Sequence, residues 1–169
     1  MEGFKSIKPT DIAENAFKLI GKDWMLITAG NGESFNTMTA SWGGLGVIWN
    51  KNVCFCFVRP QRYTYEFLER ESSFTLSFFD EKYRNALNIC GSKSGRDCDK
   101  VAEAGLTPMV CSSGSVSFRE ARLVIECRKI YFQDIDPKNF LDDLIAGNYP
   151  KADYHRMYIG EITACWIKE

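Results

Sequence analysis

The segment Val53–Val58 constrains the fold most strongly, because it is apolar at every position. A strand with one solvated face alternates apolar and polar residues, whereas a run that is apolar on both faces belongs inside a sheet. A turn signal, Asn50–Asn52, precedes the run, and Pro60, which cannot donate to a sheet ladder, follows it. The sequence therefore predicts a central strand of a barrel or sandwich over Val53–Val58.

Other segments with strand character are spread along the chain. They are Trp24–Ala29, Phe35–Ala40, Phe74–Phe79, Val116–Phe118, Ala121–Phe132 and Met157–Ile167. The turn signal Gly30-Asn31-Gly32 predicts a hairpin between the first two. The glycine-rich residues 43–50 are expected to form a loop or bulged segment. About seven antiparallel strands with short helices between them indicate a mainly β barrel rather than a doubly wound sheet.

Short helices are predicted between the strands from apolar residues at helical spacing and from capping residues. They cover Pro9–Ile20, Thr64–Arg70, Glu81–Cys90 and Asp99–Ala104, with a helical turn around Asn139–Leu144. In the first of them Gly21 follows the apolar stripe, where a C-cap glycine belongs.

The totals fit a single domain, 1–169, because 169 residues is near the usual size of one domain. The net charge of −1 gives no electrostatic case for binding nucleic acid or an anionic membrane. No apolar run is long enough to cross a bilayer, and the N-terminal residues lack the apolar core of a signal peptide. We therefore expect a cytoplasmic protein. Glycine-rich nucleotide motifs of the Rossmann or P-loop type do not follow any predicted strand.

The seven cysteines form no CxxC pair and are odd in number. Cys54 and Cys56 share one face of the predicted central strand. With a single histidine in the chain, zinc-site spacing is absent. We expect the cysteines to be buried free thiols of a protein in a reducing compartment, and a redox pair or a metal site is the alternative.

Three separate segments are dense in polar groups: Thr37–Gly44, Arg59–Thr64 and Ser92–Arg96. Taken singly, each also fits an ordinary role, as an exposed strand face, as solvated charges beside a helix, or as a polar loop. Taken together, they indicate a site for a planar ligand that carries a phosphate.

Each segment supplies a different part of such a site. The helix start at Tyr63–Thr64 offers free N–H groups to an anion, and Arg62 and Lys93 can neutralise a dianion. Gly43–Gly44 permit a close approach of the backbone to a ligand. Trp42 offers an aromatic surface, although a packed tryptophan at a strand end is the alternative.

Four motifs, in this order, resemble those of the flavin reductase-like family of FMN-binding split barrels, especially its flavoredoxin-like members. They are MTASWGGLG, then RPQRYT after the apolar strand, then CGSKSGRD, and late in the chain YHRMYIGEI. The resemblance extends from about residue 17 to residue 167. It implies a Greek-key split β-barrel of about six to seven antiparallel strands with short peripheral helices. It also implies a homodimer with FMN bound in each subunit near the dimer interface.

The resemblance assigns a role to each motif. Thr39, Ala40, Ser41 and Trp42 would line the isoalloxazine ring and ribityl chain, Arg59, Arg62 and Thr64 would lie near the ribityl–phosphate end, and Ser92, Lys93 and Ser94 would close over the phosphate. His155 is the candidate catalytic residue, because many members have a histidine before the last strand. Those members often read Asp-His, whereas this chain reads Tyr154-His155-Arg156. A structural histidine, hydrogen-bonded at the entry to that strand, is the alternative for His155.

The expected function is that of an FMN-binding oxidoreductase, an NAD(P)H-dependent flavin reductase or flavoredoxin-like electron-transfer protein. The flavin carries the redox chemistry, and the protein positions it. The leading alternative is a flavin-binding electron carrier, with an acceptor protein as partner and no productive NAD(P)H site. A barrel that binds another ligand without redox chemistry is the third reading.

Overall fold

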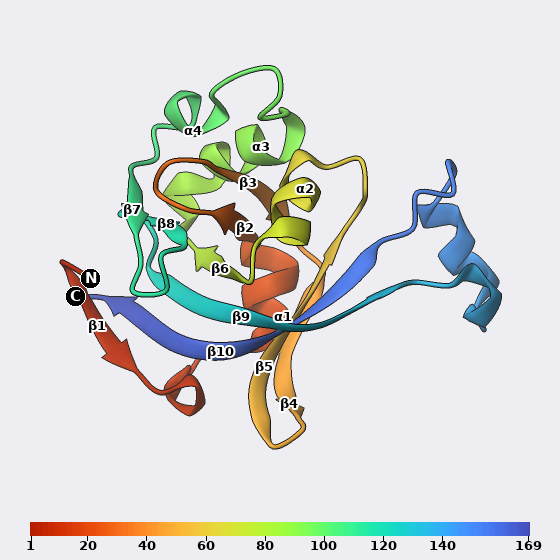
Figure 1. Ribbon diagram of the computed structural model, residues 1–169, viewed down its shortest axis with the longest axis horizontal. Coiled ribbons are helices and arrows are strands. Elements are labelled where there is room, and N and C mark those ends of the chain that lie inside the picture. The colour runs from red at the N-terminus through yellow and green to blue at the C-terminus, as the bar shows by residue number, and fades with distance from the viewer.

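The computed structural model describes residues 1–169, and its main feature is an antiparallel sheet of 8 strands that curls into a split barrel (Figure 1). The strand order is β3-β2-β6-β9-β10-β5-β4, with β1 paired to β10. The bounds are β1 Phe4–Ile7, β2 Met25–Gly30, β3 Phe35–Ala40, β4 Gly43–Ile48, β5 Lys51–Val58, β6 Ser73–Phe78, β9 Leu123–Asp134 and β10 Arg156–Lys168. β3 and β4 are consecutive in the chain, but they lie at opposite ends of this order and do not pair with each other.

A helical segment near the N-terminus closes one side of the core. It consists of α1 (Ala16–Lys18) and the π-helical turn η2 (Leu19–Asp23). Leu19 and Ile20 are buried in the main hydrophobic cluster, which contains 20 residues. Most of this cluster comes from alternate positions of β2, β5, β6 and β9, so the core occupies the inside of the curled sheet. The apolar pattern of the strands thus determines where the core lies.

The ribbon of β9 and β10 is the longest element pair, and it extends beyond the barrel. Between these strands, η4 (Pro137–Asn139) and η5 (Asp143–Asn148) protrude from the body, at the right of Figure 1. Gly160 sits where the ribbon passes over the core, and a Cβ there would lie 2.6 Å from the Phe74 ring and 2.8 Å from Cys127 Cβ. The ribbon therefore packs closely on the core only because this residue is glycine.

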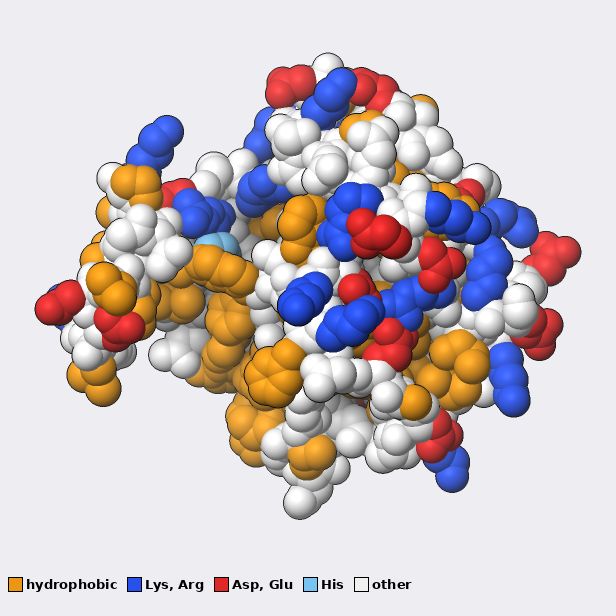
Figure 2. All heavy atoms as spheres, turned by 180° about the vertical axis from the view of Figure 1, so that it is seen from behind, with side chains coloured by type: hydrophobic (Ala, Val, Ile, Leu, Met, Phe, Trp, Pro, Cys, Tyr) orange, Lys and Arg blue, Asp and Glu red, His pale blue; other side chains and the backbone are white.

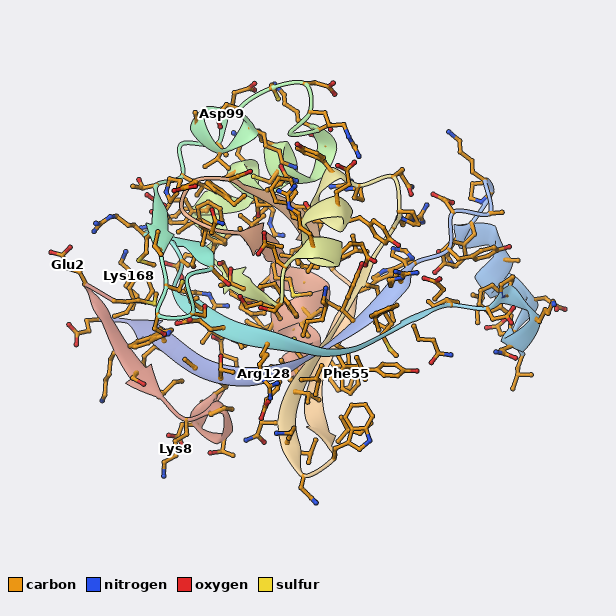
Figure 3. All side chains as sticks on the ribbon, viewed as in Figure 1. Glu2, Lys8, Phe55, Asp99, Arg128 and Lys168 are labelled. Atoms are coloured by element: carbon orange, nitrogen blue, oxygen red, sulfur yellow. The ribbon has the colours of Figure 1, made fainter.

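The two chain ends meet at the opposite end of the sheet. β1 pairs with the end of β10, with Phe4 opposite Lys168, and Figure 3 shows Glu2 and Lys168 close to each other there. Nearby, β7 (Pro108–Val110) and β8 (Val116–Phe118) form a separate two-stranded sheet.

Short helices beside β2 and β3 form the wall that carries two of the polar segments. They are α2 (Tyr63–Arg70) and α3 (Arg84–Ser92), with η3 (Glu81–Tyr83) and α4 (Lys100–Glu103) packed against α3, whereas η1 (Pro9–Asp11) contacts β10. α2 and α3 both contact β3, so the start of α2 and the end of α3 lie near the strand that bears Thr39. This packing brings together segments that are far apart in the sequence.

The predicted mainly β fold with short helices is confirmed, and so are most of its elements. The hairpin of β2 and β3, the central strand β5, the helix α2 and the internal last strand β10 lie where the pattern predicted. α3 extends to Ser92, beyond the predicted helix end at Cys90, so the polar loop begins at Lys93. The strands β1 and β7, short and on sheet margins, were not predicted.

The predicted helix over Pro9–Ile20 is wrong. The residues form the short 3₁₀ turn η1, an irregular stretch, and then α1, whose first turn is capped by Asn15 through bonds to Phe17 N and Lys18 N. The expected apolar stripe is not buried as a unit, because only Leu19 and Ile20 of the segment are buried. Without a continuous buried face, a long helix has little stabilisation from packing.

The loop predicted for residues 43–50 is also wrong, because Gly43–Ile48 is the strand β4, paired with β5. The glycines suggested a loop, but Gly43 is needed inside the strand, since a Cβ there would lie 2.6 Å from the Phe55 carbonyl oxygen. The turn is at Trp49 and Asn50, with φ of 52° and 57°, so Lys51 and Asn52 belong to β5 instead of the turn.

All seven cysteines are free thiols, and six of them are buried, which agrees with the expected reading. No group of cysteine, histidine or acidic side chains is arranged to hold a metal ion. The structure contains no helix with the length and apolar character needed to cross a membrane.

Candidate functional site

One pocket lies where β3 ends, β4 begins and β5 ends, and we call it the ring-end pocket. Its volume is ≈ 280 Å³, and it is lined by Met38, Thr39, Ala40, Ser41, Trp42, Phe57, Arg59, Arg62 and His155. Strand pairing explains the assembly, because β5 lies between β4 and β10 and its end at Val58 is opposite Arg156. Seven of the residues predicted for the site therefore share one pocket.

Trp42 and His155 form the aromatic wall of the ring-end pocket. Their ring centroids are 4.9 Å apart and their planes are inclined by 45°. Trp42 remains 44% exposed, so the packed-core alternative for this residue is wrong. An exposed indole beside an imidazole offers a flat, largely apolar surface for a planar ligand.

His155 is held by the protruding segment. Its Nδ1 lies 2.9 Å from the hydroxyl of Tyr149, which is itself buried. Burial, together with the positive charge of Arg59, lowers the pKa of His155 to about 4. The imidazole is therefore neutral near pH 7, with one nitrogen able to donate and the other able to accept.

Arg59 has partners inside the protein. Its guanidinium donates to Asp153 Oδ2 at 2.7 Å and to the Asn148 carbonyl at 2.8 Å, and it lies 5.2 Å from the centre of the Tyr149 ring. Gln61 also donates to Asp153, at 2.5 Å. These contacts hold the protruding segment, residues 135–155 between β9 and β10, against the end of β5. The role of Asp153 was not predicted, because no pattern in residues 135–155 connects it to Arg59.

A second, smaller pocket adjoins the first at Arg62, and we call it the phosphate-end pocket. Its volume is ≈ 90 Å³, and it is lined by Gln61, Arg62, Tyr63, Thr64, Ser92, Lys93, Ser94 and Lys100. Of the residues predicted for the phosphate end, Arg62, Thr64, Ser92, Lys93 and Ser94 line it, whereas Arg59 lines only the ring-end pocket; Arg62 lines both pockets. The sequence prediction missed Lys100, which reads as an ordinary exposed lysine in the first turn of α4.

Arg62 is the N-cap residue of α2, whose first turn has no side-chain cap. Its Nη2 is buried and has no hydrogen-bond partner. Burial and the nearby charge of Arg59 lower the pKa of Arg62. A buried guanidinium edge without an acceptor is costly, so this atom points to an acceptor that a ligand supplies.

Lys93 differs from Arg62 because it already has an acidic partner. Its ammonium pairs with the carboxylate of Glu103, and 48% of its side chain is exposed. The Ser92 hydroxyl donates to the Asn88 carbonyl at 2.8 Å, and the Ser94 hydroxyl accepts from Arg96 N at 3.2 Å. These groups border the phosphate-end pocket and have partners within the protein, Ser92 in α3, Lys93 in α4 and Ser94 in its own loop.

Two threonines hold the wall of the site together. The Thr39 hydroxyl donates to the Leu87 carbonyl at 2.5 Å, which joins β3 to α3. The buried Thr64 hydroxyl accepts from the Asn36 side chain at 2.7 Å, which joins α2 to β3. Both residues line the predicted pockets, and their hydroxyls have structural partners there.

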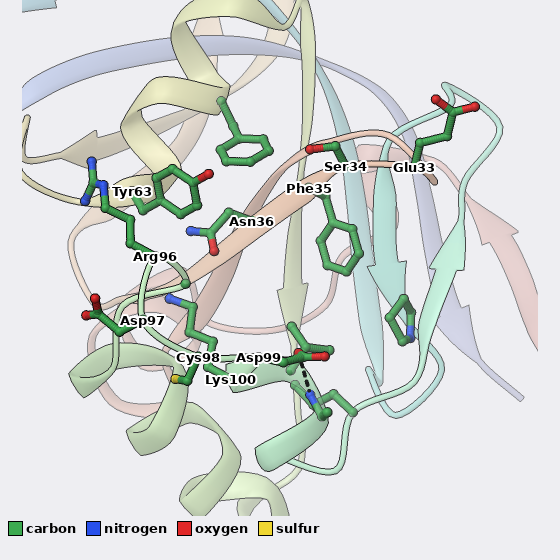
Figure 4. A pocket seen from close by; sticks show the side chains of 16 residues that line it. Glu33, Ser34, Phe35, Asn36, Tyr63, Arg96, Asp97, Cys98, Asp99 and Lys100 are labelled. Carbon is green, nitrogen blue, oxygen red and sulfur yellow. Dashed lines mark hydrogen bonds between the residues drawn. The ribbon is translucent and has the colours of Figure 1, made fainter.

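The largest cavity, of ≈ 710 Å³, lies on the other side of Tyr63 and Lys100 (Figure 4). Its arginine has partners, because Arg96 pairs with Glu66 and lies 4.6 Å from the centre of the Tyr63 ring. Its size therefore does not make it the better candidate site.

The family model of the flavin reductase like domain matches residues 18–169. Among solved structures, an FMN-binding domain of a flavin reductases-like enzyme from Shewanella baltica is 16% identical, with a TM-score of 0.71, over 98% of this chain and 77% of that chain. The flavoredoxin of Desulfovibrio vulgaris is 22% identical, with a TM-score of 0.68, over 96% and 78%. An NADH:FAD oxidoreductase from Streptomyces globisporus, in complex with NAD and FAD fragments, is 15% identical, with a TM-score of 0.63, over 85% and 73%. No curated protein sequence matches the chain.

The chain therefore belongs to the flavin reductase like family, as the motifs indicated. The solved structures share its fold, a mainly β antiparallel sheet with a few short helices. The unpartnered Arg62 Nη2 and the aromatic wall of Trp42 and His155 fit a ligand with a phosphate at one end and a planar ring at the other.

Proposed function

We propose that this protein is an FMN-dependent oxidoreductase that accepts reducing equivalents from NAD(P)H. The observation that carries the proposal is the buried Arg62 Nη2, which has no partner and lies where the ring-end and phosphate-end pockets adjoin. A ligand with a ring and a phosphomonoester, joined by a short chain, matches this arrangement. Membership of the flavin reductase like family supports the same reading.

The residues divide into two groups in this proposal. The segment from Thr39 to Trp42 would border the isoalloxazine ring, and Arg62 with Ser92 and Ser94 would border the phosphate. Bound flavin supplies the hydride and electron chemistry. The protein orients the ring, keeps one ring face open to the nicotinamide, and excludes water with the indole of Trp42.

In this proposal His155 orients the nicotinamide rather than acting as a base. Hydride transfer between a nicotinamide and a flavin needs no protein base on the hydride itself. The neutral imidazole at the mouth of the ring-end pocket presents a nitrogen to the carboxamide of the nicotinamide, and the Tyr149 hydroxyl fixes the ring. Loss of such alignment costs up to about 100-fold in rate.

Anaerobic mixing with NADH or NADPH tests the proposal. Protein reconstituted with FMN is mixed with each nicotinamide in a stopped-flow instrument, and the oxidised flavin band is followed. Bleaching by either nicotinamide, faster than that of free FMN, is the expected result. If neither nicotinamide bleaches the band while dithionite does, the protein is an electron carrier that needs an acceptor or donor protein. If the protein does not bind FMN, both the oxidoreductase proposal and the electron-carrier alternative are wrong.

We also propose that the protein is a homodimer. Figure 2 shows hydrophobic side chains gathered between the protruding segment and the β4–β5 hairpin, beside His155. Exposed large hydrophobic residues of these two parts include Val47, Trp49, Leu141 and Leu144. Contiguous apolar surface of this kind is typical of an interface, and here it borders the ring-end pocket.

Light scattering of the parent protein and of two variants tests the dimer. Trp49→Asp puts a charge on the proposed interface, so it should shift the molar mass from dimer to monomer. Val110→Asp, at a residue 58% exposed on β7, is the matched control and should leave the mass unchanged. A parent protein that is monomeric at micromolar concentration contradicts the proposal.

A further inference from the structure

Lys100 is the only lysine or arginine whose residue is buried, at 3% exposed. Its Nζ donates to the carbonyl of Cys90 at 3.1 Å and to that of Lys93 at 3.2 Å, both near the C-terminal end of α3. An ammonium group has three protons to donate, so one donor remains after these two bonds. No carboxylate pairs with it, whereas the neighbouring Lys93 is paired with Glu103.

Lys100 shares the phosphate-end pocket with Arg62. The lining of this pocket contains three cationic residues and no acidic residue, and one of the three, Lys93, is paired elsewhere. The buried Lys100 and the half-buried Arg62, whose Nη2 is buried, therefore line one pocket without a compensating charge. Burying charge without a partner is unfavourable, and a bound dianion removes the imbalance.

The pKa values agree with this geometry. Burial lowers the pKa of Lys100 to about 8, with a further contribution from the charge of Arg62. Of the other titratable groups near it, burial raises the pKa of Cys90 to about 11 and raises that of Cys98. Both thiols are therefore uncharged when Lys100 titrates.

Four further charged residues line the largest cavity, on the far side of Lys100. They are Glu33, Arg96, Asp97 and Asp99. Asp99 caps α4 by accepting from Ala102 N at 3.0 Å, and Arg96 pairs with Glu66. Neither Asp97 nor Asp99 forms an ion pair with Lys100, whose amine donates to the carbonyls of Cys90 and Lys93.

We propose that Lys100 and Arg62 together bind the dianionic phosphate of the ligand, and that Lys93 instead holds the loop by pairing with Glu103. The inference rests on the proposed flavin function, because it names the groups that recognise the phosphomonoester of FMN. It replaces Lys93, the lysine that the sequence predicted, with a buried one. The pocket volume of ≈ 90 Å³ suits a single phosphate group.

The proposal has a pH consequence in the parent protein. Phosphate binding requires a protonated Lys100, and a bound dianion raises the pKa of that ammonium. FMN affinity should therefore be constant just below pH 8 and should fall as the pH rises above the free-protein pKa of about 8. Riboflavin has no phosphate, so its affinity should not change over the same interval.

The test measures dissociation constants of FMN and riboflavin, by flavin fluorescence, for the parent protein, Lys100→Met and Lys93→Met at pH 7. Lys100→Met should weaken FMN binding by about tenfold or more, the loss of one charge-assisted bond, and change riboflavin binding by less than about threefold. Lys93→Met should leave the preference for FMN over riboflavin within about threefold. If Lys100→Met loses affinity for FMN and riboflavin equally, Lys100 only caps α3 and the proposal is overturned. The proposal is also overturned if Lys93→Met, rather than Lys100→Met, loses the preference for FMN over riboflavin.

Two measurements on the folded parent protein need no variant. FMN affinity that stays constant from pH 7.5 to pH 9.5 contradicts a role for Lys100 even if Lys100→Met does not fold. Inorganic phosphate should raise the melting temperature relative to chloride at equal ionic strength, because ligand binding stabilises the folded state. Stabilisation by phosphate without any flavin uptake would support the anion site and refute the proposed function. Flavin uptake with no FMN preference would refute the anion site alone.

Discussion

The two ends of the proposed cleft differ in how their charges are balanced. At the ring end, Arg59 has Asp153 and a backbone carbonyl as partners, and His155 is neutral and bonded to Tyr149. At the phosphate end, Arg62 has an unpartnered Nη2 and Lys100 has no acidic partner. The ring end thus pairs its cation inside the protein, with Asp153 Oδ1 as its one buried atom that lacks a partner, whereas the phosphate end lacks an anion.

This difference separates two tasks. A balanced, aromatic site holds its geometry without a ligand, so it suits the alignment of reacting rings. A pair of cations without a counter-charge, one of them buried, gains much from an anion, so it suits affinity and the choice of FMN over riboflavin. Variants at the phosphate end should therefore change binding, and variants at the ring end should change rate.

Arg62→Met should produce the largest effect, because it removes the guanidinium that lines both pockets. We expect FMN binding to weaken by about 10- to 100-fold, which corresponds to the loss of a charge-assisted bond of roughly 1.5–3 kcal/mol. Isothermal titration with FMN measures it, and riboflavin is the control ligand. Equal weakening of both flavins would show that Arg62 supports the fold rather than the phosphate.

His155→Ala should change rate rather than affinity. The anaerobic rate of flavin reduction by NAD(P)H should drop by at least about tenfold, or ~1.4 kcal/mol of barrier, while FMN affinity stays within a few-fold. Stopped-flow spectroscopy measures the rate. An unchanged rate with a lowered melting temperature would favour the structural role of His155 that its bond to Tyr149 also permits.

Acid sensitivity offers a smaller test of the ring end. The folded pKa of His155, about 4, lies below the ordinary value of 6.5, so the unfolded chain takes up a proton first as the pH falls. The neutral histidine therefore contributes stability above about pH 6.5, and this contribution is lost progressively towards pH 4. The melting temperature of the parent should fall more steeply over this interval than that of His155→Asn. Parallel melting curves would mean that His155 titrates normally.

Lys93→Met should have the smallest effect of the series. The pair of Lys93 with Glu103 is exposed to solvent, and exposed ion pairs contribute little to stability. Thermal melting should shift only slightly, and FMN affinity should stay within a few-fold. A large loss of FMN affinity would place the phosphate on the solvent side of the loop, near Lys93.

The residues of the cleft were predictable where the local sequence carries the signal. Arg62 and Thr64 follow an apolar strand at the start of a helix, Thr39 lies in a clear hairpin strand, and Trp42 follows that strand. Lys100 was not predictable, because a lysine in a polar stretch at the start of a short helix reads as exposed. Its burial comes from the packing of α4 against the end of α3, which no local pattern records.

The same distinction explains the errors in the fold. The strands with continuous apolar patterns lie where predicted, because their own side chains specify burial. β4 was missed because its glycines suggested a loop, whereas Gly43 is required by a close contact with the Phe55 carbonyl oxygen, a tertiary feature. Asp153 and Tyr149 contribute to the ring end only because the β9–β10 ribbon returns the protruding segment to Arg59.

The most direct test of the account is the visible absorbance of the protein after incubation with FMN and removal of free flavin on a desalting column. We expect the parent protein to retain FMN in proportion to protein concentration and to retain much less riboflavin. Arg62→Met should retain FMN little better than it retains riboflavin. A colourless parent protein, or equal retention of FMN and riboflavin, would contradict the assignment of the two adjoining pockets to a flavin and its phosphate.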